Sequence, residues 1–330
     1  MTADHPPQPA PDGAASPARR GRRAVVLVAA VLVLITGAAA YAVRATAPAP
    51  VADRSFDTTA PGRLLLRSDG RIAAVPLSNP AAAPTIGSAS CDRFSTANGT
   101  TLCLVARPGT PPTTSALILD RTLKETRRVG LAGVPSRARM SASGRMASWT
   151  VFVTGDSYNQ GGFSTWSGLL DTRTGYLITN MEDIPLTLNG RRYHSEDVNY
   201  WGVTFASDDN RFYATVSTKG RTYLVEGDYG AWQARTLREN AECPSLSPDG
   251  TRLVFKKRLS SGEWRLHALD LATMRETPLA ERASIDDQVA WLDAGTVMYA
   301  KGGDLWSARA DGTGVPSLLA KRASSPSAPS

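Results

Sequence analysis

The sequence predicts an all-β protein built as a six-bladed β-propeller and preceded by a single apolar N-terminal helix. Three observations lead to this prediction. A skeleton of one turn followed by two apolar strands recurs along most of the chain. Most copies of this skeleton follow one another at about 40–45 residues, the period of a four-stranded blade. Near the N-terminus, residues 24–43 carry no charge.

The N-terminal segments predict a cytoplasmic tail and a membrane-crossing helix. Residues 1–23 are rich in Pro, Ala and Asp, cannot bury much apolar surface, and should form a disordered cytoplasmic tail. Four arginines close this tail, and residues 24–43 then make a helix of roughly 30 Å, enough to span a hydrocarbon core. Because the basic residues precede the apolar run and only Arg44 follows closely, the rest of the chain should be exported.

Two interpretations of the apolar run remain open. The most apolar part, residues 24–35, has the length of a signal-peptide core, and residues 38–40 or 45–47 offer small side chains for cleavage. An uncleaved anchor accounts for the whole run and for the long leader, and we favour it. The expected location is therefore the cell membrane, with a single pass, the N-terminus in the cytoplasm and the propeller outside. Secretion after cleavage is the alternative, and the mass of the mature protein separates the two.

The rest of the chain divides into a spacer, a repeat region and a short tail. Residues 44–61 form an Ala/Pro-rich linker, residues 62–320 the propeller, and residues 321–330 a disordered tail. Six blades fit the repeats, although five or seven remain open. Residues 64–77 resemble part of a blade, so closure should borrow a strand from one terminus and hide an exposed edge. The predicted blades are 60–88, 89–134, 135–185, 196–240, 241–281 and 284–320.

The clearest copy of the repeat begins at residues 247–250, Ser-Pro-Asp-Gly. Pro presets φ, and Asp-Gly suits a tight hairpin turn. Apolar strands follow at residues 251–255 and 264–271, and the unit closes at Leu279. In the copy near residue 210, Asn210 replaces the glycine, and Asn also tolerates positive φ.

This repeat resembles that of the TolB-type propeller family, in which Ser-Pro-Asp-Gly precedes an apolar strand, a second strand that ends near Asp, and a final Leu. The segment 247–279 matches the pattern closely, and the resemblance extends over residues 62–320. It implies the propeller fold and says little about function. TolB itself carries a further domain before its propeller and works with an envelope lipoprotein. That partner is not carried over, because the linker here leads almost directly into the blades.

Composition and motifs exclude several classes of function. The net charge is +7, but the leader and Arg44 supply +3 of it, which leaves too thin an excess for nucleic-acid binding. No zinc-ligand spacing, phosphate-binding glycine loop or G-x-S-x-G elbow occurs, so we expect no metal, no cofactor and no peptidase chemistry. Adjacent carboxylates occur at 182/183, 196/197, 208/209 and 286/287, and these are more typical of solvated loops than of catalysis.

Loop lengths predict a ligand-binding face. In each blade the connections between the second and third strands, and those between blades, emerge on one face. The two longest insertions, 154–162 and 181–197, both belong to this face. The candidate contacts are Tyr158, Tyr193, His194 and Trp201. The alternative is a tolerated surface insertion with Trp201 in the blade core.

The cysteines predict one disulfide. Cys91 and Cys103 flank a turn and should lie on neighbouring strands, close enough for a bridge in an exported protein. Cys243 occupies the corresponding inner-strand position of another copy and should be a buried free thiol.

Together these features predict a non-enzymatic, membrane-anchored propeller outside the cell membrane that binds a protein, peptide or glycan of the cell envelope. The alternative is a glycan hydrolase or lyase that uses carboxylates at the central channel.

Overall fold

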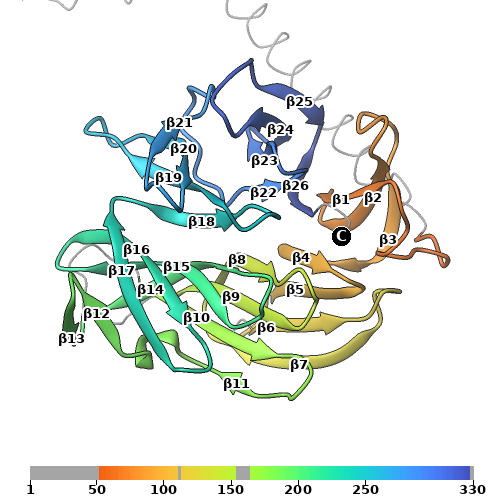
Figure 1. Ribbon diagram of the computed structural model, residues 1–330. Coiled ribbons are helices and arrows are strands. Elements are labelled where there is room, and N and C mark those ends of the chain that lie inside the picture. Colours follow the sequence, from red (N-terminus) through yellow and green to blue (C-terminus); the bar gives the residue numbers. More distant parts are fainter. Residues whose placement is uncertain (1–51, 111–112, 154–163, 328–330) are drawn as a thin grey trace, which may run out of the picture. The chain divides into compact units, whose positions relative to one another are not determined.

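A computed structural model describes residues 52–110, 113–153 and 164–327 of the chain. In this part the strands form six sheets that succeed one another around a central axis (Figure 1). The six-bladed propeller predicted from the repeats is confirmed. Within the described part, no helix is long and apolar enough to span a bilayer, and the helix predicted at residues 24–43 lies outside that part.

Each blade is an antiparallel sheet of strands that are consecutive in the sequence, except at the closure and in blade 4, where β12 pairs in parallel with β17. Blade 1 contains β1 (Arg63–Ser68), β2 (Arg71–Pro76), β3 (Thr85–Ser90) and β26 (Ala323–Ser327). Blade 2 contains β4 (Arg93–Ala97), β5 (Thr100–Arg107), β6 (Thr113–Leu119) and β7 (Glu125–Leu131). Blade 3 contains β8 (Val134–Met140), β9 (Met146–Val153), β10 (Ser164–Asp171) and β11 (Leu177–Ile178).

The second half of the ring follows the same plan with one addition. Blade 4 contains β14 (Asn199–Phe205), β15 (Arg211–Thr218), β16 (Arg221–Asp228) and β17 (Gln233–Glu239), and it is extended by β12 (Leu186–Leu188) and β13 (Arg191–Tyr193). Blade 5 contains β18 (Glu242–Leu246), β19 (Arg252–Arg258), β20 (Trp264–Asp270) and β21 (Glu276–Pro278). Blade 6 contains β22 (Ala290–Trp291), β23 (Thr296–Lys301), β24 (Asp304–Arg309) and β25 (Ser317–Ala320).

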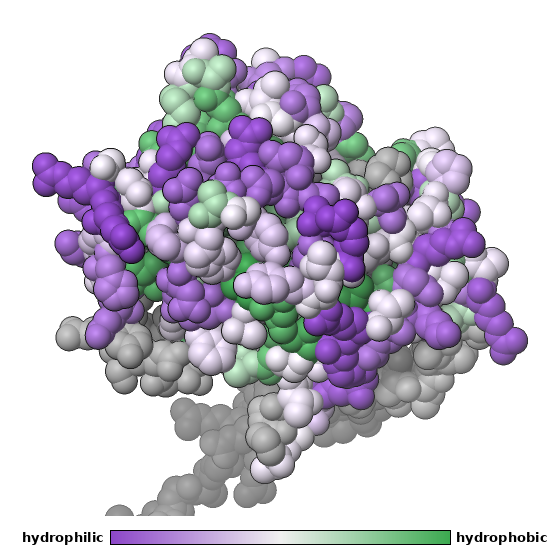
Figure 2. Space-filling view, turned by 60° about the horizontal axis from the view of Figure 1, so that its bottom comes forward, coloured by the Kyte–Doolittle hydropathy of each residue, from purple (hydrophilic) through white to green (hydrophobic). Residues whose placement is uncertain are grey.

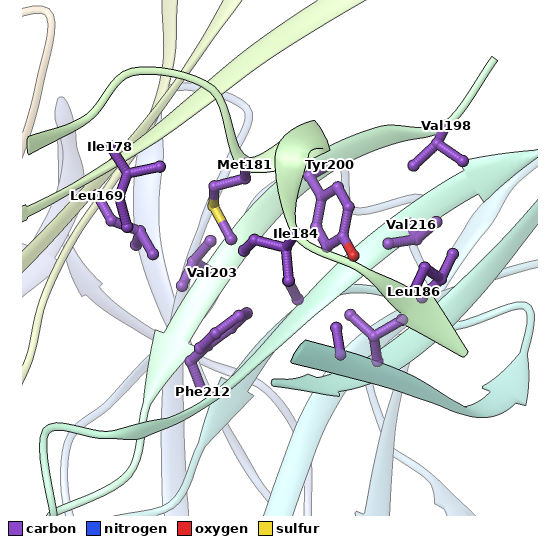
Figure 3. Close-up of a cluster of buried hydrophobic side chains, with 13 residues drawn as sticks. Leu169, Ile178, Met181, Ile184, Leu186, Val198, Tyr200, Val203, Phe212 and Val216 are labelled. Carbon is purple, nitrogen blue, oxygen red and sulfur yellow. The ribbon is translucent and has the colours of Figure 1, made fainter. Parts of the chain in front are cut away.

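The hydrophobic core is divided among the interfaces between neighbouring blades. Among the described residues, six clusters of buried apolar side chains occur, and each lies between two successive blades. Figure 3 shows the cluster between blades 3 and 4, where Leu169 of one sheet faces Tyr200 and Phe212 of the next. Because each sheet buries both faces, its middle strands are apolar at nearly every position, which explains the continuous apolar runs of the sequence.

The C-terminal residues close the ring. Residues 321–330 were predicted to be a disordered tail, but residues 323–327 form β26, the innermost strand of blade 1 (Figure 1). This strand pairs with β1, with Leu65 opposite Ser327 and Ser68 opposite Ala323. The borrowed strand that the incomplete first repeat implied is therefore C-terminal. Its residues are mostly polar and lack the apolar pattern that would predict a buried strand.

The described end of the predicted linker is also part of the packed domain. Phe56 is only 6% exposed and joins the cluster between blades 1 and 2. The backbone N–H of Asp53 donates to Ile86 O at 2.9 Å, and that of Thr58 donates to Arg121 O at 2.9 Å. Residues 53–58 are thus fixed against the blades, because one aromatic ring among polar residues supplies buried contacts.

The repeat residues stabilise turns. The aspartate that ends the third strand of a blade caps the following turn: Asp171 accepts a hydrogen bond from the backbone N–H of Arg173 at 2.9 Å, and Asp270 accepts one from Thr273 at 2.8 Å. In the turn between β14 and β15 of blade 4, the residue with positive φ is Asp209 (+56°), and the assignment to Asn210 was wrong. The turn there begins one residue earlier, at Ala206.

Candidate ligand pocket at the channel mouth

A cavity of about 360 Å³ opens on the face where the connections between the second and third strands emerge. Its walls come from the inner strands of blades 3, 4 and 5, and from the segment that leads into blade 6. We call this cavity the channel-mouth pocket. Charged residues and tryptophans of the lining that matter for the argument are Arg137, Trp201, Glu242, Lys256, Trp264 and Asp286.

Two buried cations meet one carboxylate in this pocket. Lys256 of β19 has a side chain only 4% exposed, and Arg137 of β8 only 11%. Both pair with Asp286, Lys256 through its Nζ and Arg137 through its Nη2 at 3.3 Å from Oδ1. Burial alone would raise the pKa of Asp286, but Lys256, Arg137 and Arg93 outweigh it and hold that pKa below its ordinary value. Asp286 is therefore ionised at neutral pH.

A second carboxyl group lies beside Lys256. Glu242 of β18 is opposite Lys256 in the β18–β19 ladder and is only 7% exposed. Burial raises the pKa of Glu242, and the attraction of Lys256 and a hydrogen bond from Thr222 only partly oppose this. The pocket also holds Arg258, so its three cations outnumber its two carboxyl groups and leave an excess of positive charge.

Tryptophan rings line the pocket among these cations. Lys256 Nζ lies 4.5 Å from the ring centroid of Trp264, and the guanidinium carbon of Arg258 lies 5.0 Å from it. These are cation–π contacts, which hold both cations in place without neutralising them. Trp201 of β14 contributes a further ring from blade 4.

Deeper in the channel, side chains bridge the blades. Gln288 Nε2 donates to Val203 O of blade 4 at 3.0 Å and to Pro244 O of blade 5 at 2.9 Å. Arg139 Nη2 donates to Val289 O at 2.7 Å, and burial lowers the pKa of Arg139 to about 10, so this group also stays charged at neutral pH. Because these bonds tie the segment before blade 6 to its neighbours, the pocket has a rigid floor.

A second cavity, of about 370 Å³, lies at the opposite end of the channel. Its lining comes mainly from the ends of the first strands and from the turns that follow them, and it includes Phe205 and Trp291 beside small residues such as Ser247. Among the described residues that line it, Arg139 is the one with a charge. The channel-mouth pocket thus carries more charged side chains than this cavity.

The structure brings only one of the predicted contacts to this pocket. Trp201 lines it. Tyr193 lies in β13 at the outer edge of blade 4, where its hydroxyl is 2.8 Å from Thr218 Oγ1, and the neighbouring His194 is exposed. Neither lines the pocket, so the structure does not group Tyr193 and His194 with Trp201 there; that they contact a ligand stays a prediction. Tyr158 lies outside the described residues.

The reason is the path of the second insertion. Residues 186–193 form a hairpin whose first strand, β12, pairs in parallel with β17, the outermost regular strand of blade 4. The free edge of β17 offers unpaired backbone groups, and the insertion satisfies them instead of projecting over the channel. The insertion thus widens one blade and leaves the pocket mouth to other elements.

The sequence prediction missed Arg137, Glu242 and Lys256. A signal for them exists: a charged residue within a strand that is otherwise buried, as Lys256 directly follows Val254 and Phe255. Such a charge must have a partner or face a cavity. Of the four predicted carboxylate pairs, only 286/287 reaches this pocket, through Asp286. The others are engaged elsewhere; for example, Asp197 accepts from Thr218 Oγ1 at 2.6 Å.

The cysteines occupy two environments. Cys91 and Cys103 form a disulfide with their Cα atoms 5.4 Å apart, which fastens the entry of blade 2 to its second strand. Cys243 is a buried free thiol on β18 and lines the channel-mouth pocket. No group of His, Cys, Asp and Glu side chains in the described ranges could hold a metal ion.

This ring of six sheets with a terminal strand as its closure is a six-bladed β-propeller with a polar pocket at one channel mouth, and its fold is like that of TolB. It is similar to the crystal structure of TolB from Acinetobacter baumannii, with a TM-score of 0.55 and 16% identity over 82% of this chain and 67% of that one. It is also similar to a puromycin-hydrolysing peptidase from Mycobacterium tuberculosis, with a TM-score of 0.50 and 14% identity over 80% of this chain and 44% of that one. These similarities concern the fold alone. No protein-family model and no curated protein matches the sequence.

Proposed function

We propose that this chain is a membrane-anchored, extracytoplasmic propeller that binds a partner of the cell envelope through the channel-mouth pocket and performs no chemistry. The observation that carries the proposal is the pocket itself: buried cations and tryptophan rings converge there from three blades on rigid inner strands. Convergent polar groups in a preformed concave site are typical of ligand recognition. The uncharged run at residues 24–43 supports export and anchoring.

The rest of the surface supports recognition at the pocket. On the side shown in Figure 2, hydrophilic and intermediate residues cover most of the coloured surface, and hydrophobic residues show only in small areas between them. A broad apolar docking surface is therefore not visible on that side.

The proposal predicts that side chains lining the channel-mouth pocket, and not exposed side chains outside it, determine how much partner is captured. Replacing Trp201 with Ala should lower recovery of the partner at least tenfold when the full-length protein is captured from solubilised membranes, because Trp side chains dominate binding energy in desolvated sites. Trp166→Ala is the matched control, since Trp166 is 41% exposed on blade 3 and does not line the pocket. Equal recovery by the wild type and the Trp201 variant, at equal thermal stability, would contradict the proposal.

A specific observation favours a second candidate function, glycan cleavage by a hydrolase or lyase reaction. Glu242 and Asp286 line one pocket, and their environments displace their pKa values in opposite directions, as in pairs that serve as acid and base. Against it, the Asp286 carboxylate is already paired with Lys256 and Arg137.

The two functions differ in what Glu242→Gln does. If the pocket only binds, neither the wild type nor this variant shortens any member of a panel of purified envelope glycans, as measured by chain-length analysis. If it is catalytic, the wild type shortens one of them and loss of the acid slows that reaction by a factor of about 100 or more. Such a loss in a folded variant would replace our proposal with the enzymatic one.

A further inference from the structure

The ion pairs of the channel-mouth pocket are unequally buried. Lys256 and Arg137 are 4% and 11% exposed in their side chains, whereas their shared partner Asp286 is 68% exposed. A buried cation needs an anionic partner, because leaving it unpaired carries a large desolvation cost. Asp286 has no such need, since its carboxylate can be hydrated if it turns away. The cations are therefore the fixed part of this site, and the anion is the exchangeable part.

The backbone around Asp286 allows that exchange. Asp286 lies between β21 and β22, in a segment without strand pairing. Its neighbours hold the segment in place: Ile285 is 1% exposed, and Gln288 bridges two blades through its side chain. A rotation of the Asp286 side chain toward solvent would thus free the two cations without moving the chain.

Arg137 has unused capacity for a carboxylate. Its Nη1 donates to Ser136 O at 3.0 Å, and its Nη2 donates to Asp286 at both the backbone oxygen (3.5 Å) and Oδ1 (3.3 Å). Its buried Nε has no hydrogen-bond partner among the described residues. The Nε and Nη2 groups of an arginine match the two oxygens of one carboxylate, and such bidentate pairs are stronger than single contacts. Asp286 uses only one of these two donors, so a better-placed carboxylate would gain a bond.

The Trp264 ring favours a peptide over a sugar as the carrier of that carboxylate. A sugar would stack on a tryptophan face, but Lys256 and Arg258 already lie over the ring of Trp264, which leaves Trp201 as the ring for stacking. The pocket volume of about 360 Å³ is at the small end of ligand sites, enough for one acidic residue and its neighbours.

We infer that Asp286 stands in for a ligand carboxylate: an acidic side chain of an extended peptide displaces it and binds between Lys256 and Arg137. This inference rests on the proposed function, since it names the chemistry of the partner that the channel-mouth pocket receives. Asp286 competes with that ligand and keeps the two buried cations paired when no ligand is present.

The test uses two blocked tripeptides as probes, acetyl-Gly-Glu-Gly-amide and its Gln counterpart, titrated calorimetrically into the full-length protein in detergent. The Glu peptide should bind Asp286→Asn at least tenfold more tightly than it binds the wild type, because the competing carboxylate is gone. The Gln peptide should show no such gain. Asp69→Asn is the matched control, since Asp69 is an exposed aspartate that pairs with an arginine on blade 1 and does not line this pocket, and it should leave the affinity of the Glu peptide unchanged.

A second variant keeps the inference open to refutation if Asp286→Asn folds poorly. Lys256→Met retains a long side chain without the charge, and it should reduce binding of the Glu peptide at least tenfold. Equal affinities of the Glu and Gln peptides for Asp286→Asn, or unchanged binding to Lys256→Met, would overturn the inference. Tenfold tighter binding of a galacturonate trisaccharide by Asp286→Asn, without a response to the Glu peptide, would overturn the peptide assignment.

Failure of the inference and failure of the proposed function give different results. If Trp201→Ala loses the partner but the Glu peptide shows no dependence on Asp286, the pocket binds a partner by other chemistry. If the Glu peptide behaves as expected but Trp201→Ala captures the partner normally, the pocket recognises carboxylates and the natural partner binds elsewhere.

Discussion

Deleting residues 321–330 is expected to abolish the cooperative unfolding transition of the propeller. The deletion removes β26, so β1 would lose its inner neighbour and become a free edge along the channel. The buried side chains of Leu64 and Leu66 would lose Ala323 from their cluster. Since a domain is stabilised by only about 5–15 kcal/mol, loss of one whole strand and of ring closure should remove most of that margin.

Circular dichroism during urea denaturation measures this effect. The matched control ends at Ser327 and thus keeps every residue of β26. The control should unfold cooperatively at the wild-type midpoint, whereas the chain ending at Ala320 should show a broad transition or none. A chain ending at Ala320 that unfolds with the wild-type midpoint and slope would show that closure does not depend on β26.

Replacing Asp171 with Ala is expected to destabilise the propeller by about 2–3 kcal/mol, the second-largest effect among these changes. The side chain of Asp171 is 2% exposed, and its Oδ2 lies 2.6 Å from Arg145 Nη2. The same carboxylate accepts backbone hydrogen bonds from Arg173 and Thr174 in the turn that follows β10. The variant would lose both the turn cap and the partner of a partly buried guanidinium, and thermal or urea unfolding would measure the difference.

The pH dependence of this difference gives a second readout. The hydrogen bond from Arg145 and those from the turn hold the pKa of Asp171 well below its ordinary value. A carboxyl whose pKa is lowered by folding stabilises the fold above the unfolded pKa of about 3.9 and loses that contribution as the pH falls. The gap between wild type and variant should therefore be constant from pH 7 to about 5 and narrow below pH 4.

The control for this prediction is Asp311→Ala on blade 6. Asp311 also caps a turn and pairs with an arginine, but its side chain is 40% exposed and that of Arg309 is 58% exposed. Solvent screens such a pair, so the unfolding midpoint should move far less. Equal shifts for the two variants would show that burial does not set the strength of the Asp171 pair.

Much of the fold could be predicted because it depends on local chemistry that repeats. Ser247 to Gly250 marks a turn through Pro and Asp-Gly, and the apolar runs beside it mark buried strands. The blade boundaries follow from copies of this unit. Strand β26 escaped prediction because its sequence, Ala-Ser-Ser-Pro-Ser, has almost no apolar residues and is held by pairing with β1. Such long-range pairing leaves no periodic signal in the strand itself.

The candidate site was harder to predict than the fold. The loop argument selected the face on which the pocket lies, and it selected Trp201. It did not predict the place of Tyr193, because a long insertion was assumed to project, whereas this one pairs with the edge of β17. The pocket cations come from inner strands of different blades, and only the ring geometry brings Arg137 near Lys256. No spacing along a single chain segment encodes that juxtaposition.

The central claim, that the partner binds at the channel-mouth pocket, is tested most directly by site-specific photocrosslinking in intact cells. A photoreactive phenylalanine analogue replaces Phe152, which lines the pocket, in one strain and Ser207, which lines the opposite cavity, in another. We predict a crosslinked adduct from position 152 and none from position 207. An adduct from position 207 with none from position 152 would contradict the account.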